Sequence, residues 1–243
     1  MQLKGRVALV TGAGRRVGQA IAIALGEKGM RVAVHYHGSA AGADETVASI
    51  KAKGGDARTF RADLGRPETH AKLVAEVKAA FGTLDVLVNS AAIMLRTPFG
   101  EVTAEQWDSI MALNIRAPFF LSQAAAPALR AAKGAIVNIA DLAAFETWPA
   151  YVPHGISKSG VVQLTRSLAR VLAPDVRANA VAPGTVLLPE DWSTQADERL
   201  RQTTPLGRTG SPADVSAAVI FLLESDYITG ETLIVDGGRH IRT

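Results

Sequence analysis

The sequence predicts a doubly wound α/β fold, with a parallel sheet of seven strands covered by helices on both faces. Short apolar runs alternate along the chain with longer segments whose apolar residues have helical spacing. Such runs are typical of strands buried on both faces, and their alternation with helices indicates parallel strands joined by crossovers. No internal repeat or low-complexity linker interrupts the pattern, so we expect one domain over residues 1–243.

Seven apolar runs are the candidate strands, and the segments between them have the start and stop signals of helices. The strands are expected at residues 7–10, 32–34, 57–62, 84–88, 135–139, 176–181 and 233–235. Three expected helices are each followed by glycine, at residues 17–28, 40–53 and 67–81. Two more begin at capping residues, because Thr103 forms a capping box with Gln106 and Ser211 precedes a further apolar segment.

The composition excludes several classes of protein. The formal net charge is only +3 and the basic residues are scattered, so we expect no nucleic-acid partner. The chain has no cysteine, which excludes disulfides, thiolate catalysis and zinc–thiolate sites. No apolar stretch approaches the length of a bilayer span, and residues 1–10 lack a signal-peptide pattern. We therefore expect a cytoplasmic protein without a membrane partner.

The first strand leads directly into a glycine-rich turn, Thr11-Gly-Ala-Gly-Arg-Arg-Val-Gly18, and then into a helix. Glycine at Gly12, Gly14 and Gly18 lets the backbone turn tightly and approach a pyrophosphate, while the helix start at Val17 supplies free N–H groups. In this context the pattern predicts a Rossmann-type dinucleotide site.

The end of the second strand predicts which dinucleotide binds. A carboxylate at this place often holds the ribose 2′-hydroxyl of NAD, but no acidic residue occurs before Asp44. The 2′-phosphate of NADPH would instead meet basic and hydroxyl side chains, which favours NADPH as the cofactor. These candidate residues are Arg15, Arg16, His35, Tyr36, His37 and Ser39.

Over nearly its whole length the chain resembles the short-chain dehydrogenase/reductase family. The glycine turn is similar to the Thr-Gly-x-x-x-Gly-x-Gly motif of that family, and Val235-Asp-Gly-Gly238 to its C-terminal signature. Asn114 and Lys158 match residues of its active site. The resemblance implies that the cofactor also contacts Asp63, Leu64, Asn89, Ser90, Ala91, Pro183, Gly184 and Val186. The resemblance also implies a homotetramer.

Within that family the chain looks most like the pteridine reductases. Arg16 replaces the middle glycine of the first motif, residues 35–39 read His-Tyr-His-x-Ser, and Asp141 stands where the family has its catalytic serine. This resemblance implies NADPH-dependent reduction of a pterin or folate ring. A carbonyl reductase of other specificity and a catalytically impaired NADPH-binding protein are the alternatives.

The catalytic tyrosine of the family is missing. His154 lies four residues before Lys158, where the tyrosine belongs, and Asp141 lies thirteen residues before His154. Tyr151 lies seven residues, or two helical turns, before Lys158 and precedes Pro153, so we expect it before the helix proper, where it could line the pocket without replacing the missing tyrosine. Three interpretations stay open: His154 donates the proton, Asp141 donates it, or the site is weak.

The substrate is expected to lie at the carboxyl end of the strands, under a lid around residues 185–205. Trp192 in the lid could cover a flat ring. Ile93 and Phe99, after the fourth strand, and Tyr151 would supply other parts of the wall.

Overall fold

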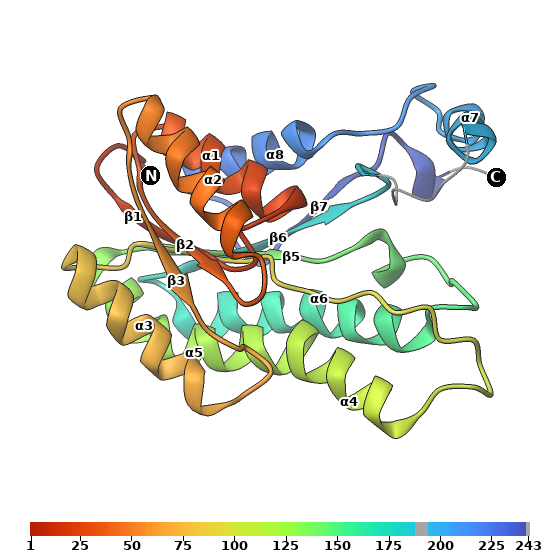
Figure 1. Cartoon of the computed structure of the whole chain (residues 1–243), viewed down its shortest axis with the longest axis horizontal. Coiled ribbons are helices and arrows are strands. Elements are labelled where there is room, and N and C mark those ends of the chain that lie inside the picture. The colour runs from red at the N-terminus through yellow and green to blue at the C-terminus, as the bar shows by residue number, and fades with distance from the viewer. Residues whose placement is uncertain (188–193, 242–243) are drawn as a thin grey trace.

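A parallel sheet of seven strands forms the centre of the molecule (Figure 1). The computed structural model describes residues 1–187 and 194–241. The strands pair in the order β3-β2-β1-β4-β5-β6-β7, and every pairing is parallel. Their bounds are β1 Val7–Val10, β2 Arg31–Tyr36, β3 Asp56–Arg61, β4 Val86–Asn89, β5 Ala135–Ile139, β6 Arg177–Pro183 and β7 Thr232–Val235.

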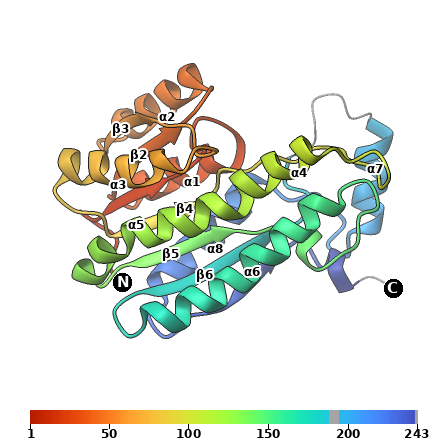
Figure 2. The ribbon, with the colours of Figure 1, turned by 90° about the horizontal axis from the view of Figure 1, so that it is seen from below.

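Helices cover both faces of this sheet, which confirms the predicted fold class. One face carries α1 (Arg16–Glu27), α2 (Ala40–Ala52) and α8 (Pro212–Glu224). The other carries α3 (Glu68–Phe81), α5 (Ala117–Ala132) and α6 (Val152–Leu172), as the view from below shows (Figure 2). Two shorter helices, α4 (Ala104–Met111) and α7 (Thr194–Thr203), lie beyond the sheet at its carboxyl edge. None of the described helices is both long and apolar enough to cross a bilayer.

The central strand β1 shows why apolar runs form this sheet. All four of its residues are fully buried. Ala8 and Val10 join the core under α1 and α8, whereas Val7 and Leu9 join the core under α3 and α5. Successive side chains of a strand point to opposite faces, so a strand covered on both sides needs apolar residues at every position.

The observed strands differ from the predicted ones by up to two residues at their ends. The fourth strand was expected from Leu84 but begins at Val86. Asp85 instead accepts hydrogen bonds from the backbone N–H of Val7 (2.9 Å) and from Arg6 (2.9 Å). The second strand extends to Tyr36 through His35, whose side chain has buried partners of its own. Apolar patterning did not reveal these ends, because they depend on polar contacts between distant segments.

A π-helical turn at Ala112–Arg116 joins α4 to α5 and was not predicted. The capping box at the start of α4 is confirmed, since Thr103 and Gln106 each bond the backbone N–H of the other. Pro118 lacks the N–H that an α-helix would direct at the carbonyl of Asn114. The backbone N–H of Ala117 bonds the carbonyl of Ala112, five residues back. The wider turn carries Asn114.

Candidate active site

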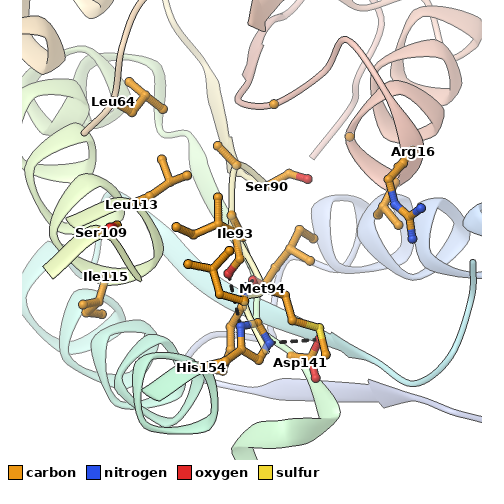
Figure 3. A pocket seen from close by; sticks show the side chains of 18 of the residues that line it. Arg16, Leu64, Ser90, Ile93, Met94, Ser109, Leu113, Ile115, Asp141 and His154 are labelled. Atoms are coloured by element: carbon orange, nitrogen blue, oxygen red, sulfur yellow. Dashed lines mark hydrogen bonds and ion pairs between the residues drawn. The ribbon is translucent and has the colours of Figure 1, made fainter. Parts of the chain in front are cut away.

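A large cavity lies along the carboxyl edge of the sheet, where the segments that follow all seven strands meet. Its volume is about 2400 Å³, more than one drug-sized ligand requires and enough for a dinucleotide with a substrate. Figure 3 shows part of its wall. Of the predicted cofactor residues, the wall contains Gly12, Gly14, Arg15, Arg16, Val17, Gly18, His35, Tyr36, His37, Ser39, Asp63, Leu64, Ser90, Ala91, Lys158, Pro183, Gly184 and Val186.

The glycine turn packs against the segment that follows β4. Gly12 has φ +66°, and a Cβ atom there would lie 2.9 Å from Cα of Ala91. A Cβ atom on Gly18 would lie 2.4 Å from the carbonyl oxygen of Gly12. The side chain of Arg15, at the N-cap position of α1, makes no capping hydrogen bond to the described residues, which leaves the first N–H groups of the helix open to a ligand at the cavity. These features fit the pyrophosphate of a dinucleotide.

Arg16 lies in this turn with a backbone conformation that disfavours an arginine. Its φ is +53°, in the left-handed region, which costs roughly 1–2 kcal/mol for a residue with a side chain. Its guanidinium donates a hydrogen bond to the carbonyl of Leu187 (3.1 Å). Arg16 therefore connects the glycine turn to the beginning of the predicted lid. The exposed side chains of Arg15 and His37 add further basic groups to the wall.

His35 braces the glycine turn and does not supply positive charge. Its Nδ1 accepts a hydrogen bond from the N–H of Gly12 (3.2 Å), and its Nε2 donates one to the carbonyl of Ala62 (3.1 Å). Burial lowers the pKa of His35 to about 4, so the ring is neutral. The expectation that it meets a 2′-phosphate as a basic group is wrong. Its contribution is to hold β1, β2 and β3 in register around the turn.

Two other predicted residues, Asn89 and Phe99, lie outside the cavity wall. Asn89 points into the protein, where it donates to Oδ1 of Asn138 (2.8 Å), and it is outside the cavity wall. Phe99 is 86% exposed and is also outside the wall, because its loop carries it past the site. Trp192 lies outside the described residues. The described part of the predicted lid includes α7.

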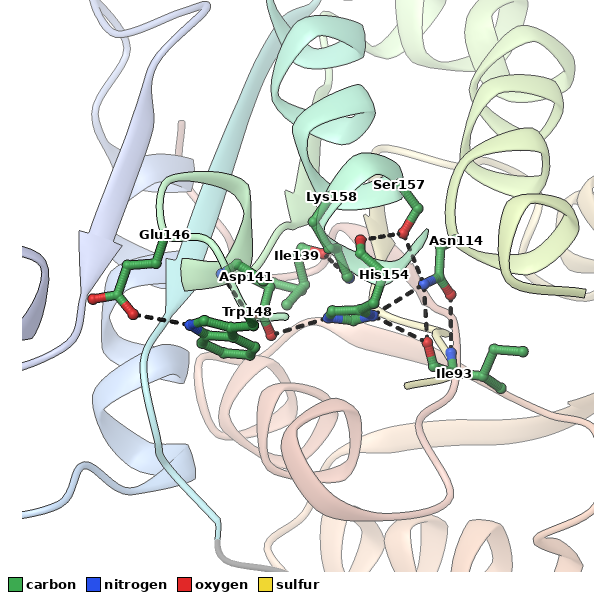
Figure 4. A network of polar contacts seen from close by, with 10 residues as sticks. Ile93, Asn114, Ile139, Asp141, Glu146, Trp148, His154, Ser157 and Lys158 are labelled. Atoms are coloured by element: carbon green, nitrogen blue, oxygen red, sulfur yellow. Dashed lines mark hydrogen bonds and ion pairs between the residues drawn. The ribbon is translucent and has the colours of Figure 1, made fainter. Parts of the chain in front are cut away.

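The predicted catalytic residues come together around one turn of α6 (Figure 4). His154 and Lys158 are buried on the same face, with 2% and 4% of their surfaces exposed, and both line the cavity. Asn114 lies behind His154, outside the wall. Its Oδ1 accepts from the N–H of Ile93 (2.9 Å), and its Nδ2 donates to the carbonyl of Ile93 (2.9 Å) and to Oγ of Ser157 (3.0 Å). Asn114 thus ties the loop after β4 to α6.

His154 faces Asp141 across the cavity wall. Its Nε2 lies 3.6 Å from Oδ2 of Asp141, too far for a good hydrogen bond. Among the described residues this buried Nε2 has no hydrogen-bond partner. Oδ1 of Asp141 accepts from the N–H of Ala143 (2.8 Å), which fixes the carboxyl group. Because an unpaired buried polar atom is costly, the arrangement suits a ligand oxygen bound beside both side chains.

Lys158 contributes a buried ammonium next to this pair. Its Nζ donates to the carbonyl of Ile139 (2.8 Å) at the end of β5. Burial lowers the pKa of Lys158, and the negative charge of Asp141 opposes part of that shift. Lys158 therefore gives the wall a buried amine whose Nζ is anchored at the end of β5.

Sequence reasoning missed several side chains of the wall, among them Trp148 and Arg239. Trp148 donates to Glu146 (3.0 Å) and meets Tyr151 edge to face at 6.3 Å. Tyr151 lines the cavity and precedes α6, as predicted. The signal for Trp148 was available, because it belongs to the same loop as Tyr151. Arg239 follows β7 and donates to Oγ1 of Thr185 (2.9 Å).

Comparison with known proteins shows the family. A family model described as enoyl-(acyl carrier protein) reductase matches residues 12–240. The chain is 37% identical over 240 residues to the 3-oxoacyl-[acyl-carrier-protein] reductase FabG of Staphylococcus aureus strain Mu50, covering 96% of this chain and 98% of that protein.

Two solved structures have the same fold. One, from Sinorhizobium meliloti 1021, is assigned as a short-chain alcohol dehydrogenase; it has a TM-score of 0.92 and 37% identity, and the match covers 99% of this chain and 98% of that one. The angucycline C-6 ketoreductase LanV, with bound NADP, has a TM-score of 0.92 and 35% identity, with 99% and 97% covered. None of these relatives supports the predicted pteridine reductase branch. The chain belongs to the short-chain dehydrogenase/reductase family.

Proposed function

We propose that the protein is an NADPH-dependent ketoreductase. The observation that carries this proposal is the unpartnered Nε2 of His154, which faces Asp141 in the cavity that begins at the glycine turn. A ketone oxygen can lie beside both groups. The ketoreductase names of FabG and LanV, and the NADP bound to LanV, support the same reaction class.

The residues divide into a cofactor end and a reaction end. NADPH, when bound, supplies a hydride to the carbonyl carbon of the substrate. The first-turn N–H groups of α1 bind the pyrophosphate, and Arg15, Arg16 and His37 bind the 2′-phosphate. Lys158 holds a ribose hydroxyl. His154 delivers a proton from Nε2 to the carbonyl oxygen, so ketone, NADPH and one proton give alcohol and NADP⁺.

NADPH should bind about 10- to 100-fold more tightly than NADH, because hydrogen bonds to charged groups are each worth roughly 1.5–3 kcal/mol. Arg16→Ala should remove a large part of this preference while changing the affinity for NADH little. Fluorescence titration of both cofactors with both proteins measures it. Equal affinity of the unmodified protein for NADPH and NADH would contradict the assignment of the basic residues.

The reaction class is tested by NADPH oxidation with a panel of substrates. We expect turnover of a 3-oxoacyl thioester or a polycyclic ketone, and a smaller rate or none with dihydrobiopterin and dihydrofolate. The pterin reading is the second candidate, because Asp141 replaces the family serine and Arg16 the middle glycine. Turnover of pterins alone would favour that reading. Binding of NADPH without oxidation by any compound would show an impaired, binding-only protein.

A further inference from the structure

Arg239 lies on the β7 side of the cavity wall, and the guanidinium of Arg16 reaches toward the same segment, where it bonds the carbonyl of Leu187. The wall includes Arg15 and His37 near β1 and β2, and it includes Arg239 after β7. Because β7 is an edge strand, four strands from β1 and five from β2, Arg239 lies on a different part of the wall from Arg15 and His37. Figure 1 shows the C-terminal turn beside α7, away from α2.

The turn that carries Arg239 is held in place by Asp236. Oδ1 of Asp236 accepts from the N–H of Gly238 (2.8 Å), and Oδ2 accepts from the N–H (2.7 Å) and Nδ1 (2.8 Å) of His240. The Asp236 side chain is 3% exposed. Gly237 has φ +67°, and a Cβ atom there would lie 2.8 Å from Cγ2 of Thr204. The backbone of Arg239 is therefore fixed by contacts on both sides.

We propose that Arg239 binds an anionic group of the substrate, so that the ketone reduced here carries a carboxylate or a phosphate. The guanidinium is on the cavity wall, where it donates to the hydroxyl of Thr185. A guanidinium has five N–H donors in a planar fork that matches carboxylate and phosphate oxygens, and such charge-assisted bonds are among the stronger polar contacts. This proposal rests on the ketoreductase function proposed above.

The order of charges along the wall also orients the substrate. Asp141 follows the end of β5, and His154 lies in the first turn of α6. Both are therefore between the cofactor end of the wall and Arg239. An anionic group is repelled by the carboxylate of Asp141 and attracted by Arg239, so it lies on the β7 side. The carbonyl of the same molecule is then left beside Nε2 of His154.

Matched pairs of charged and neutral ketones test the proposal. Acetoacetate is compared with methyl acetoacetate, and acetoacetyl-coenzyme A with the neutral N-acetylcysteamine thioester of the same acyl group. Arg239→Gln should lower kcat/KM about 10- to 100-fold for the charged member of at least one pair, mainly through KM. The neutral members should change less than about twofold. Glutamine can still bond Thr185, and Arg239→Lys, which keeps the charge, should lose less.

Arg170→Gln is the matched control, because Arg170 is exposed in the last turn of α6 and lies outside the cavity wall. It removes the same charge and should leave all four substrates unaffected. A loss for acetoacetate alone identifies a carboxylate, and a loss for the coenzyme A ester alone identifies a phosphate. Equal losses for charged and neutral members, or no loss for either pair, would overturn the proposal.

A binding measurement separates failure of this proposal from failure of the proposed function. Saturation-transfer NMR with the NADP⁺ complex compares acetoacetate with methyl acetoacetate and needs no turnover. If no ketone is reduced but acetoacetate binding depends on Arg239, the reductase assignment fails and the anion site stands. If ketones are reduced and Arg239→Gln leaves the binding and kinetics of both charged probes unchanged, the anion site fails and the reductase stands.

Discussion

His154→Ala should lower kcat on a reducible ketone by about 10²- to 10⁴-fold, the range that a positioned general acid contributes. The reason is that the buried Nε2 of His154 has no hydrogen-bond partner among the described residues and faces the place we assign to the carbonyl oxygen. Asp141→Asn should cost less, about tenfold, because asparagine keeps the shape and still accepts from the N–H of Ala143. Steady-state kcat at saturating NADPH measures both.

A matched control separates chemistry from folding. His70 is another buried histidine, 2% exposed, on α3 and outside the cavity wall. His70→Ala should lower the melting temperature and leave kcat at saturating NADPH within a fewfold of the unmodified protein. A greater loss in Asp141→Asn than in His154→Ala would move the proton to Asp141. Since neighbouring groups can titrate as a pair, one pH profile does not assign the donor, and the substitutions must.

His154→Tyr gives an independent reading of the same site. If the histidine is adapted to its own substrate, the phenol should lower turnover of that substrate. A rise in turnover of ketones would show that the site is a weakened form of the family arrangement, in which tyrosine precedes lysine by four residues. The comparison uses the same ketone panel and the same NADPH concentration.

Lys158→Met should lower kcat/KM by about 10²- to 10³-fold, the loss seen when one preorganised electrostatic group is removed from an active site. The same change should leave the protein equally or more stable. Burial disfavours the Lys158 ammonium, and an apolar side chain of similar volume avoids that cost. Activity of this one variant should therefore fall without a loss of thermal stability. Loss of both activity and stability would contradict this account.

The lowered pKa of Lys158 should also make the free energy of unfolding depend on pH. The folded-state pKa lies below the ordinary value of 10.5, so the unfolded chain binds more protons between those two pH values. The free energy of unfolding of the unmodified protein should therefore rise with pH across that window. Lys158→Met, which has no amine at this position, should lack this rise. Lys78→Met makes the same chemical change at an exposed position of α3 and should keep the rise of the free energy of unfolding with pH.

The sequence predicted the sheet because strands buried on both faces must be apolar, as β1 shows through Leu9 and Val10. It predicted the glycine turn because Gly12 and Gly18 have no room for a side chain. It did not predict the role of His35, since the bond from Gly12 to His35 joins residues 23 positions apart and depends on how β1 and β2 pair. Local pattern contains no information about such a contact.

The same distinction, between features that local sequence predicts and contacts that only folding creates, applies to the residues of the candidate site. His154 and Lys158 were predictable because they match, by resemblance, the two family positions that lie four residues apart on one helix. The inward direction of Asn89 was not, because it depends on Asn138 of the neighbouring strand. Arg239 was missed because only the folded C-terminal turn brings it to Thr185, 54 residues away. Phe99 was wrongly assigned to the wall, since apolar character in a loop does not show whether the side chain is covered.

The π-helical turn at residues 112–116 constrains any attempt to make this enzyme more robust. Each residue added to a helix rotates all that follows by roughly 100°, so the wide turn sets the angular phase between α4 and α5. This angular phase directs the side chain of Asn114 toward Ile93 and Ser157, with which it forms hydrogen bonds. Replacing Pro118 with a strong helix former would relieve the local irregularity and favour an unbroken α-helix. Stability engineering here would then work against the amide that supports His154, so this helix is a poor place to begin.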